Sequence, residues 1–68
     1  MEKLRTWRKS LNPPTLKHAG KLLGVSAVQV HRYETGEQDV PPTKVIQYEE
    51  VTGIPRHELR PDVFGEAV

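Results

Sequence analysis

Apolar residues recur at helical spacing at the start of the chain. Leu4, Trp7 and Leu11 lie three or four positions apart, which places them on one side of a helix. The pattern predicts an amphipathic helix from about Glu2 to Ser10 or Leu11. Two prolines at positions 13 and 14 then end it, because the residue before a proline avoids helical backbone angles. The segment that follows is therefore expected to be a stiff, extended connector.

Each of the next two predicted helices begins with a hydroxyl residue and ends with a glycine. Thr15 and Gly24 bound the first of them, and Ser26 and Gly36 bound the second. A hydroxyl oxygen accepts hydrogen bonds from N–H groups that the first helical turn leaves unpaired, and glycine readily takes the left-handed conformation that ends a helix. The apolar or small residues expected on the inner face of the first helix are Leu16, Ala19, Gly20, Leu22 and Leu23.

Gly20 is an unfavourable residue inside a helix, by about 1 kcal/mol relative to alanine. A helix tolerates glycine where another backbone must approach closely. The helix that follows, crossing at a steep angle, is the expected neighbour. The sequence therefore predicts two tightly packed helices joined by a short turn at Gly24.

A longer helix is predicted in the second half of the chain, after a polar loop that starts at Glu37. Pro42 suits the first position of this helix, which should run to Val51 or Thr52. Gly53 predicts a left-handed end to the helix, with Ile54 supplying the accompanying apolar contact. The residues expected to form its apolar stripe are Val45, Ile46, Tyr48 or Glu49, and Val51.

The last part of the chain predicts one further turn of helix, from Pro55 through Leu59. Residues 60–64 are expected to be irregular and extended, because Arg60 precedes a proline. Leu59, Val63 and Phe64 are the expected anchors of this segment. With no hairpin signal and no internal repeat, the sequence predicts a single all-α domain of four helices plus a short C-terminal helical turn.

The helix predicted between Ser26 and Gly36 has an unusual outer face. Val30 and Tyr33 can face a core, and Trp7 is likewise assigned to the core. The residues left for the other sides are Ala27, Val28, Gln29, His31 and Arg32. A solvated helix face normally carries Glu and Lys, whereas two small apolar groups, an amide, an imidazole and a guanidinium suit the edges of bases. We therefore interpret this segment as a recognition helix.

Charge is distributed unevenly along the chain, although the net charge is only +1. Residues 1–33 carry seven Lys or Arg against one Glu, a net charge of +6, whereas residues 34–68 carry three against eight acids, a net charge of −5. Such an imbalance is typical of a protein that presents one face to a polyanion. The basic half contains the predicted recognition helix, which indicates a nucleic acid as the partner.

Composition limits the cellular compartment and the cofactors that can be expected. There is no cysteine, and His18, His31 and His57 are too widely spaced for a local zinc site, so no metal or other cofactor is expected. No apolar run approaches the roughly 20 residues that span a bilayer, and no signal-peptide pattern precedes the first helix. We expect a cytoplasmic protein without a membrane partner.

The segment from Thr15 to Gly36, TLKHAGKLLGVSAVQVHRYETG, resembles the helix-turn-helix of the Cro and CI type of phage and bacterial repressors. The segment from Thr52 to Phe64 resembles the ending of the Cro-like and YdaS-like branch of that superfamily. This resemblance implies a compact, lambda-repressor-like helix-turn-helix domain over residues 1–68, with the motif at about 15–36 and a C-terminal packing or dimerisation segment at about 53–68.

The same resemblance implies a bacterial or phage-encoded transcriptional regulator, a Cro-like repressor that binds double-stranded operator DNA as a homodimer. It also implies that Arg8 pairs with Glu34, which ties the first helix to the end of the recognition helix. A pseudo-palindromic operator follows from the two-fold symmetry of such a dimer. The expected dimer contacts, some of which must instead close the monomer core, are Tyr48, Val51, Ile54, Val63 and Phe64.

Specific contacts to DNA are expected from four residues of the recognition helix. Ala27 and Val28 can pack on thymine methyl groups, Gln29 can pair with adenine, and Arg32 can bind guanine in a bidentate manner. The residues expected to contact phosphates are Thr15, Lys17, Lys21, Ser26, His31 and Thr35. Of these, His31 is placed with the phosphates or the solvent because it lies on the flank of the helix.

Three alternatives compete with DNA binding. The helix could be an ordinary packed helix whose exposed face happens to lack acids. An enzyme is disfavoured, because the chain has no phosphate-binding glycine loop, no metal-ligand cluster and no recognisable nucleophile motif. An antitoxin-like module that binds a protein partner through its acidic half, and regulates its own synthesis, stays open and is compatible with DNA binding.

Overall fold

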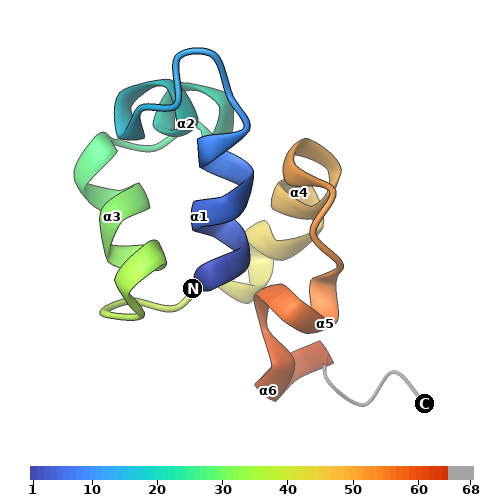
Figure 1. The fold of residues 1–68 in the computed structure, drawn as a ribbon. Helices are drawn as coiled ribbons and strands as arrows, with labels where there is room; N and C mark the ends of the chain where they lie inside the picture. Colours follow the sequence, from blue (N-terminus) through green and yellow to red (C-terminus); the bar gives the residue numbers. More distant parts are fainter. Residues whose placement is uncertain (65–68) are drawn as a thin grey trace. The chain divides into compact units, whose positions relative to one another are not determined.

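Six α-helices form the part of the protein that the structure, a computed structural model, describes, which is residues 1–64 (Figure 1). The all-α prediction is confirmed. The chain divides into two compact units, Met1–Gln38 and a second that begins at Asp39. The helices of the first unit are α1 (Glu2–Lys9), α2 (Leu16–Leu23) and α3 (Ala27–Thr35). Those of the second are α4 (Pro42–Thr52), α5 (Arg56–Leu59) and α6 (Pro61–Phe64).

Helices α2 and α3 pack against each other through a short turn, and both have the predicted caps. The hydroxyl of Thr15 accepts a hydrogen bond from the N–H of His18 at 3.1 Å. The hydroxyl of Ser26 accepts one from the N–H of Gln29, also at 3.1 Å. Gly24 ends α2 with a φ of 78°, in the left-handed region. The start and end of each helix thus follow from local chemistry that the sequence already shows.

Gly20 lies where the main chain between α2 and α3 comes closest to α2. A Cβ atom at this position would lie 2.5 Å from the carbonyl oxygen of Val25 and 3.1 Å from the carbonyl carbon of Ser26. The N–H of Val25 donates to the carbonyl oxygen of Gly20 at 2.8 Å, which holds the two segments together. The predicted close approach is confirmed, but the neighbour is the main chain leading into α3 rather than the body of that helix.

Gly20→Ala is expected to lower the free energy of unfolding by up to about 2 kcal/mol, because an overpacking cost of about 1–3 kcal/mol is set against a gain in helix propensity of about 1 kcal/mol. The clash is with main-chain atoms, which cannot rotate away. Urea unfolding measures the effect. The control is Lys21→Ala, an exposed position on the same helix where a change within about 0.5 kcal/mol is expected. A Gly20→Ala variant more stable than the parent by about 1 kcal/mol would show that the turn shifts at no cost.

The inner face of the first unit is narrower than the sequence pattern indicates. Leu22, expected on the inner face of α2, is 44% exposed, and Trp7 is half-buried rather than part of the core. The backbone that approaches α2 does so at Gly20, and the buried residues of α2 are Ala19, Gly20 and Leu23. The buried apolar residues of this unit are Leu4, Ala19, Leu23, Val30 and Tyr33.

Helix α4 begins at Pro42 and ends at Gly53, whose φ is 76°, as predicted. Its buried residues are Val45 and Tyr48, three positions apart. Ile46 and Val51, which the sequence placed on the apolar stripe, are 40% and 38% exposed, so the covered part of α4 is narrower than the predicted stripe. The buried apolar residues of the second unit are Val40, Val45, Tyr48, Ile54 and Leu59.

The prediction of an irregular, extended segment at residues 60–64 is wrong, because α6 forms there. Arg60 does take non-helical angles, φ −140° and ψ 78°, as expected before a proline. The residues after it are not restricted in this way, and Pro61 suits a first helical position, where no N–H is needed. The carbonyl oxygen of Arg60 accepts from the N–H groups of Val63 at 3.1 Å and Phe64 at 2.8 Å. Val63, a predicted anchor, is 47% exposed, and Phe64 is half-buried.

The Arg60 side chain holds α6 in place. Its guanidinium donates to both carboxylate oxygens of Asp62, at 2.8 and 2.5 Å, and to the carbonyl oxygen of Val40 at 2.7 Å. The hydrogen bond from Arg60 is the main cause that lowers the pKa of Asp62 below its usual value. The same hydrogen bond raises the pKa of Arg60.

Asp62→Asn is expected to remove a part of the pH dependence of stability. The pKa of Asp62 is lower in the folded chain than in the unfolded chain, so its ion pair stabilises the fold above the usual aspartate pKa of about 3.9. That stabilisation is lost as the pH falls through the lower pKa of the folded state. Parent and variant should therefore differ in urea midpoint at neutral pH and converge in acid. Parallel curves over the whole range would show that the pair contributes nothing.

Among the described residues, no helix is both long and apolar enough to cross a membrane. Within the same residues no group of three or more His, Asp or Glu is placed to hold a metal ion.

Candidate nucleic-acid interface

The outward side of α3 presents the side chains that the sequence singled out. Val28 is 58% exposed, and His31 and Arg32 are also exposed. Ala27 and Gln29 are half-buried at the edge of this side. The acid within the helix, Glu34, is buried and forms an ion pair with Arg8 of α1. The exposed residues of α3 itself therefore include no carboxylate, which leaves the outward side of the helix compatible with a polyanion.

Gln29 and Arg32 are both contacted by the loop that follows α3. The Gln29 side-chain Nε2 donates to Oε1 of Gln38 at 2.9 Å. The Arg32 Nε lies 3.8 Å from Oε2 of Glu37, and both of these side chains are largely exposed. The main-chain N–H of Gln38 donates to the carbonyl oxygen of Arg32 at 3.2 Å. The loop thus turns back along α3 and reaches the two polar residues that were expected to read bases.

The hydroxyls expected to contact phosphates are used in different ways. Thr15 and Ser26 accept hydrogen bonds at the starts of α2 and α3, and accepting leaves the hydroxyl proton able to donate to a phosphate oxygen. Thr35 instead donates to the carbonyl oxygen of Arg32 at 3.2 Å and accepts from the N–H of Glu37. Its proton is thus engaged in the turn at the far end of α3. Thr35 fits the structure of that turn better than a phosphate contact.

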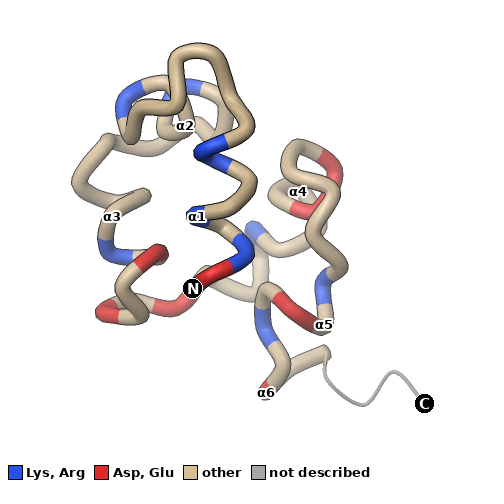
Figure 2. Tube along the Cα trace, viewed as in Figure 1, with Lys and Arg blue, Asp and Glu red and all other residues tan. Residues whose placement is uncertain are grey.

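The cations expected to contact phosphates lie on the surface of the first unit. Lys17 and Lys21 are exposed on α2 (Figure 2). This unit carries seven Lys or Arg against three acids, a net charge of +4. Figure 2 shows most of the Lys and Arg of this unit along α1 and α2, with acidic residues at the start of α1, at the end of α3 and in the loop after it. Most of the positive charge of this unit thus lies on α1 and α2, and Arg32 is the cation beside Glu37.

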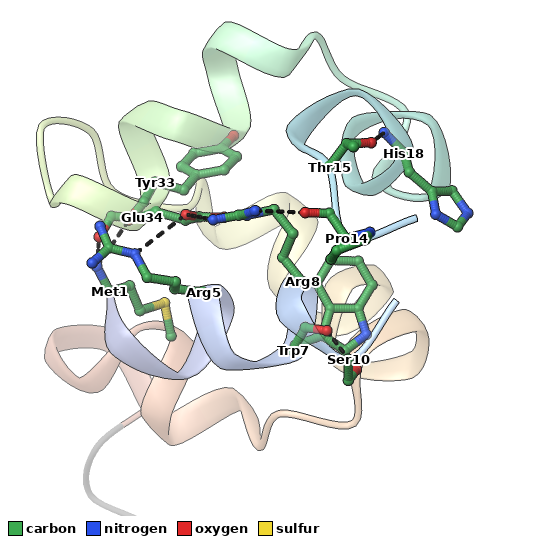
Figure 3. A network of polar contacts seen from close by, with 10 residues as sticks. All are labelled: Met1, Arg5, Trp7, Arg8, Ser10, Pro14, Thr15, His18, Tyr33 and Glu34. Atoms are coloured by element: carbon green, nitrogen blue, oxygen red, sulfur yellow. Dashed lines mark hydrogen bonds and ion pairs between the residues drawn. The ribbon is translucent and has the colours of Figure 1, made fainter. Parts of the chain in front are cut away.

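An ion pair between Arg8 and Glu34 joins α1 to α3 (Figure 3). The Arg8 Nε lies 2.6 Å from Oε2 of Glu34, and its Nη2 lies 3.2 Å from Oε1. The third nitrogen, Nη1, donates to the carbonyl oxygen of Pro14 at 2.8 Å. Arg5 is 3.5 Å from the same carboxylate. The pair implied by the family resemblance is present, and Arg8 also holds the connector that leads into α2.

Two further contacts fix the ends of these segments. The Met1 amino group donates to the carbonyl oxygens of Tyr33 and Glu34 at the end of α3 (Figure 3). A ring nitrogen of His18, Nδ1, lies 2.9 Å from the carbonyl oxygen of Pro13. The end of α3 and the connector that leads into α2 are therefore held by contacts with the first fourteen residues.

The family model described as "Bacterial toxin YdaS" matches residues 17–68. The chain belongs to this family. The matched segment includes α2 from its second residue, all of α3 and the second unit, so the YdaS family pattern covers the outward side of α3 and the loop after it. The likeness to the YdaS-like branch is therefore confirmed, while membership of the wider Cro and CI type stays a prediction. No curated protein and no solved structure matches the chain significantly.

Sequence reasoning missed two residues of this candidate interface, Glu37 and Gln38. Both belong to a polar loop, and no feature of the sequence indicates that they fold back onto α3. The nearest signal is the left-handed glycine at position 36, which reverses the chain direction just before them. The contact itself depends on how the loop turns after that glycine.

Proposed function

We propose that the chain is a sequence-specific, double-stranded DNA-binding transcriptional regulator, a Cro-like repressor that inserts α3 into the major groove. The observation that carries this proposal is the outward side of α3, where the exposed residues of the helix itself include no carboxylate, in a unit with a net charge of +4. Phosphate contacts supply most of the affinity of such proteins, and side chains on a helix read the bases. Both kinds of group are present in residues 1–38.

The roles proposed within the groove follow the chemistry of each side chain. Ala27 and Val28 pack on thymine methyl groups, Gln29 pairs with adenine, and Arg32 binds guanine. The groups proposed to bind phosphates are the hydroxyls of Thr15 and Ser26 and the cations Lys17, Lys21 and His31. Arg32 must leave Glu37 to reach a base, which costs little, because an exposed ion pair at 3.8 Å contributes about 1 kcal/mol or less.

A homodimer is part of the proposal, because one such unit contacts too few base pairs for useful specificity. Its half-sites should be centred about 34 Å apart, one turn of DNA. Tyr48 and Ile54 are buried within the chain and cannot serve as dimer contacts without rearrangement. Val51 and Val63 are exposed, and they are the remaining candidates with the half-buried Phe64. Neither a cofactor nor an enzymatic reaction is part of the proposal.

Selection of bound duplexes from a random pool tests the proposal. We expect a consensus with dyad symmetry, and an affinity for it that falls steeply as the salt concentration rises. A consensus without dyad symmetry would reject the homodimer. Failure to enrich any sequence, at low salt and with folded protein, would reject sequence-specific DNA binding.

The description of the family as a bacterial toxin supports a second candidate, in which the chain acts in a toxin and antitoxin pair through a protein partner. Induced expression in a bacterial host tests it, with Gln29→Ala/Arg32→Ala as the comparison. Growth arrest that persists in this double variant, under conditions where DNA binding is lost, would favour the protein partner. Arrest that disappears together with DNA binding would favour transcriptional regulation.

A further inference from the structure

Gln38 lies outside α3 but touches its outward side. Its Oε1 accepts the hydrogen bond from Nε2 of Gln29 at 2.9 Å, across nine positions of sequence. Its main-chain N–H is fixed to the carbonyl oxygen of Arg32 at 3.2 Å, so the residue is anchored at both ends. Gln29 is anchored as well, since its own N–H donates to the hydroxyl of Ser26. Two anchored residues thus present one amide to the other.

The hydrogen bond to Gln38 limits how the Gln29 amide can face a base. The amide at the end of a glutamine side chain has an NH₂ group, which donates two hydrogen bonds, and an oxygen, which accepts them. Turning the amide by half a turn exchanges these two groups. Adenine requires both ends in a set order, because its N7 accepts and its N6 donates. The hydrogen bond to Gln38 uses one N–H of Gln29, which leaves the other N–H and the oxygen for those two groups. With the Gln29 amide turned the other way, its oxygen would face Oε1 of Gln38, and a hydrogen bond would form only if the Gln38 amide turned as well.

We propose that Gln38 is a positioning residue for base reading, which sets the orientation of the Gln29 amide for an A·T pair before DNA binds. The proposal rests on the proposed function of α3. Gln38 acts through Gln29 and not by a base contact of its own. Its effect should therefore be seen in the choice of base at a single position of each half-site, and only when Gln29 is present.

The test compares Gln38→Ala and Gln38→Glu, each alone and combined with Gln29→Ala. Dissociation constants are measured for the selected consensus and for a duplex in which the A·T pair read by Gln29 is replaced. Gln38→Ala should weaken binding to the consensus by about two- to tenfold, the range for one hydrogen bond, and should leave binding to the replaced duplex unchanged. In the Gln29→Ala background it should change neither duplex.

Gln38→Glu is the matched control, because a carboxylate accepts the same hydrogen bond from Gln29. It should keep the base preference of the parent, while its negative charge weakens binding to both duplexes by the same factor. A role of Gln38 in loop structure alone would not produce this difference between alanine and glutamate. Loss of the preference in both variants would overturn the proposal.

The remaining outcomes separate this proposal from the proposed function. An equal loss on both duplexes for Gln38→Ala, or a loss that persists in the Gln29→Ala background, would overturn the positioning role while leaving DNA binding intact. Absence of duplex binding by the parent would reject the proposed function, and the positioning role with it. NMR of the free protein tests the contact itself: Gln38→Ala should shift the side-chain NH₂ signals of Gln29, and Gln38→Glu should leave them closer to those of the parent.

Discussion

Arg8→Ala is expected to lower the free energy of unfolding by about 3–5 kcal/mol, because it leaves a buried carboxylate without its main partner. The Glu34 side chain is 2% exposed, so water cannot replace the two hydrogen bonds from Arg8. Arg5, 3.5 Å away and 42% exposed, compensates only in part. The loss approaches the whole stability of a small domain. Thermal unfolding followed by circular dichroism measures it.

Two further variants show whether the stranded charge is the cause. Arg5→Ala removes a cation near the same carboxylate from an exposed site, and about 1 kcal/mol or less is expected. The double variant Arg8→Ala/Glu34→Ala should be more stable than Arg8→Ala alone, because it removes the unpaired charge. An Arg8→Ala variant that melts with the parent would show that the ion pair does not stabilise the fold.

The parts of the fold that could be predicted are those set by local chemistry. Hydroxyl caps at Thr15 and Ser26 and left-handed glycines at positions 24, 36 and 53 give the bounds of α2, α3 and α4. Each of these signals acts within a few residues, so it does not depend on how the chain packs. Gly20 adds one non-local inference, since a costly residue in a helix indicates a close neighbour.

Burial was harder to predict, because it depends on which neighbours cover a helix. Ile46 and Leu22 are as apolar as their buried neighbours, yet both are exposed. The helical period alone allows a wider stripe of apolar residues on each helix than the stripe that neighbouring residues bury. The prediction at residues 60–64 fails for a different reason. The restriction that a proline imposes applies only to the residue before it, Arg60, and not to the four residues that form α6.

The candidate interface also has one part that the sequence predicts and one part that it does not. The residues on the outward side of α3 follow from the helical period once its caps are known, and Val30 and Tyr33 are buried as predicted. The contacts from Glu37 and Gln38 depend on the path of a loop after a left-handed glycine. The path of a loop is set by several weak contacts together, and no single residue of the sequence predicts it.

Arg32→Ala should weaken binding to the selected consensus by about 1–3 kcal/mol and remove the preference at one position of each half-site. Arg32 is exposed on α3, in the last turn of the helix, and its guanidinium has the forked geometry that matches guanine. Lys21→Ala provides the contrast, since Lys21 lies on α2, which crosses the DNA backbone in this kind of docking. It should weaken binding to every duplex alike and lower the salt slope by about one per subunit.

The two variants share one experiment, in which dissociation constants are measured for the consensus and for a scrambled duplex at several salt concentrations. A base contact changes the ratio of the two constants, whereas a phosphate contact changes only their common dependence on salt. Glu37→Gln removes a negative charge close to the DNA and frees Arg32 at little cost, so it should strengthen binding to both duplexes by a similar factor. Equal losses on the two duplexes for Arg32→Ala would place its guanidinium on a phosphate, and base reading would then rest on Gln29 and its apolar neighbours.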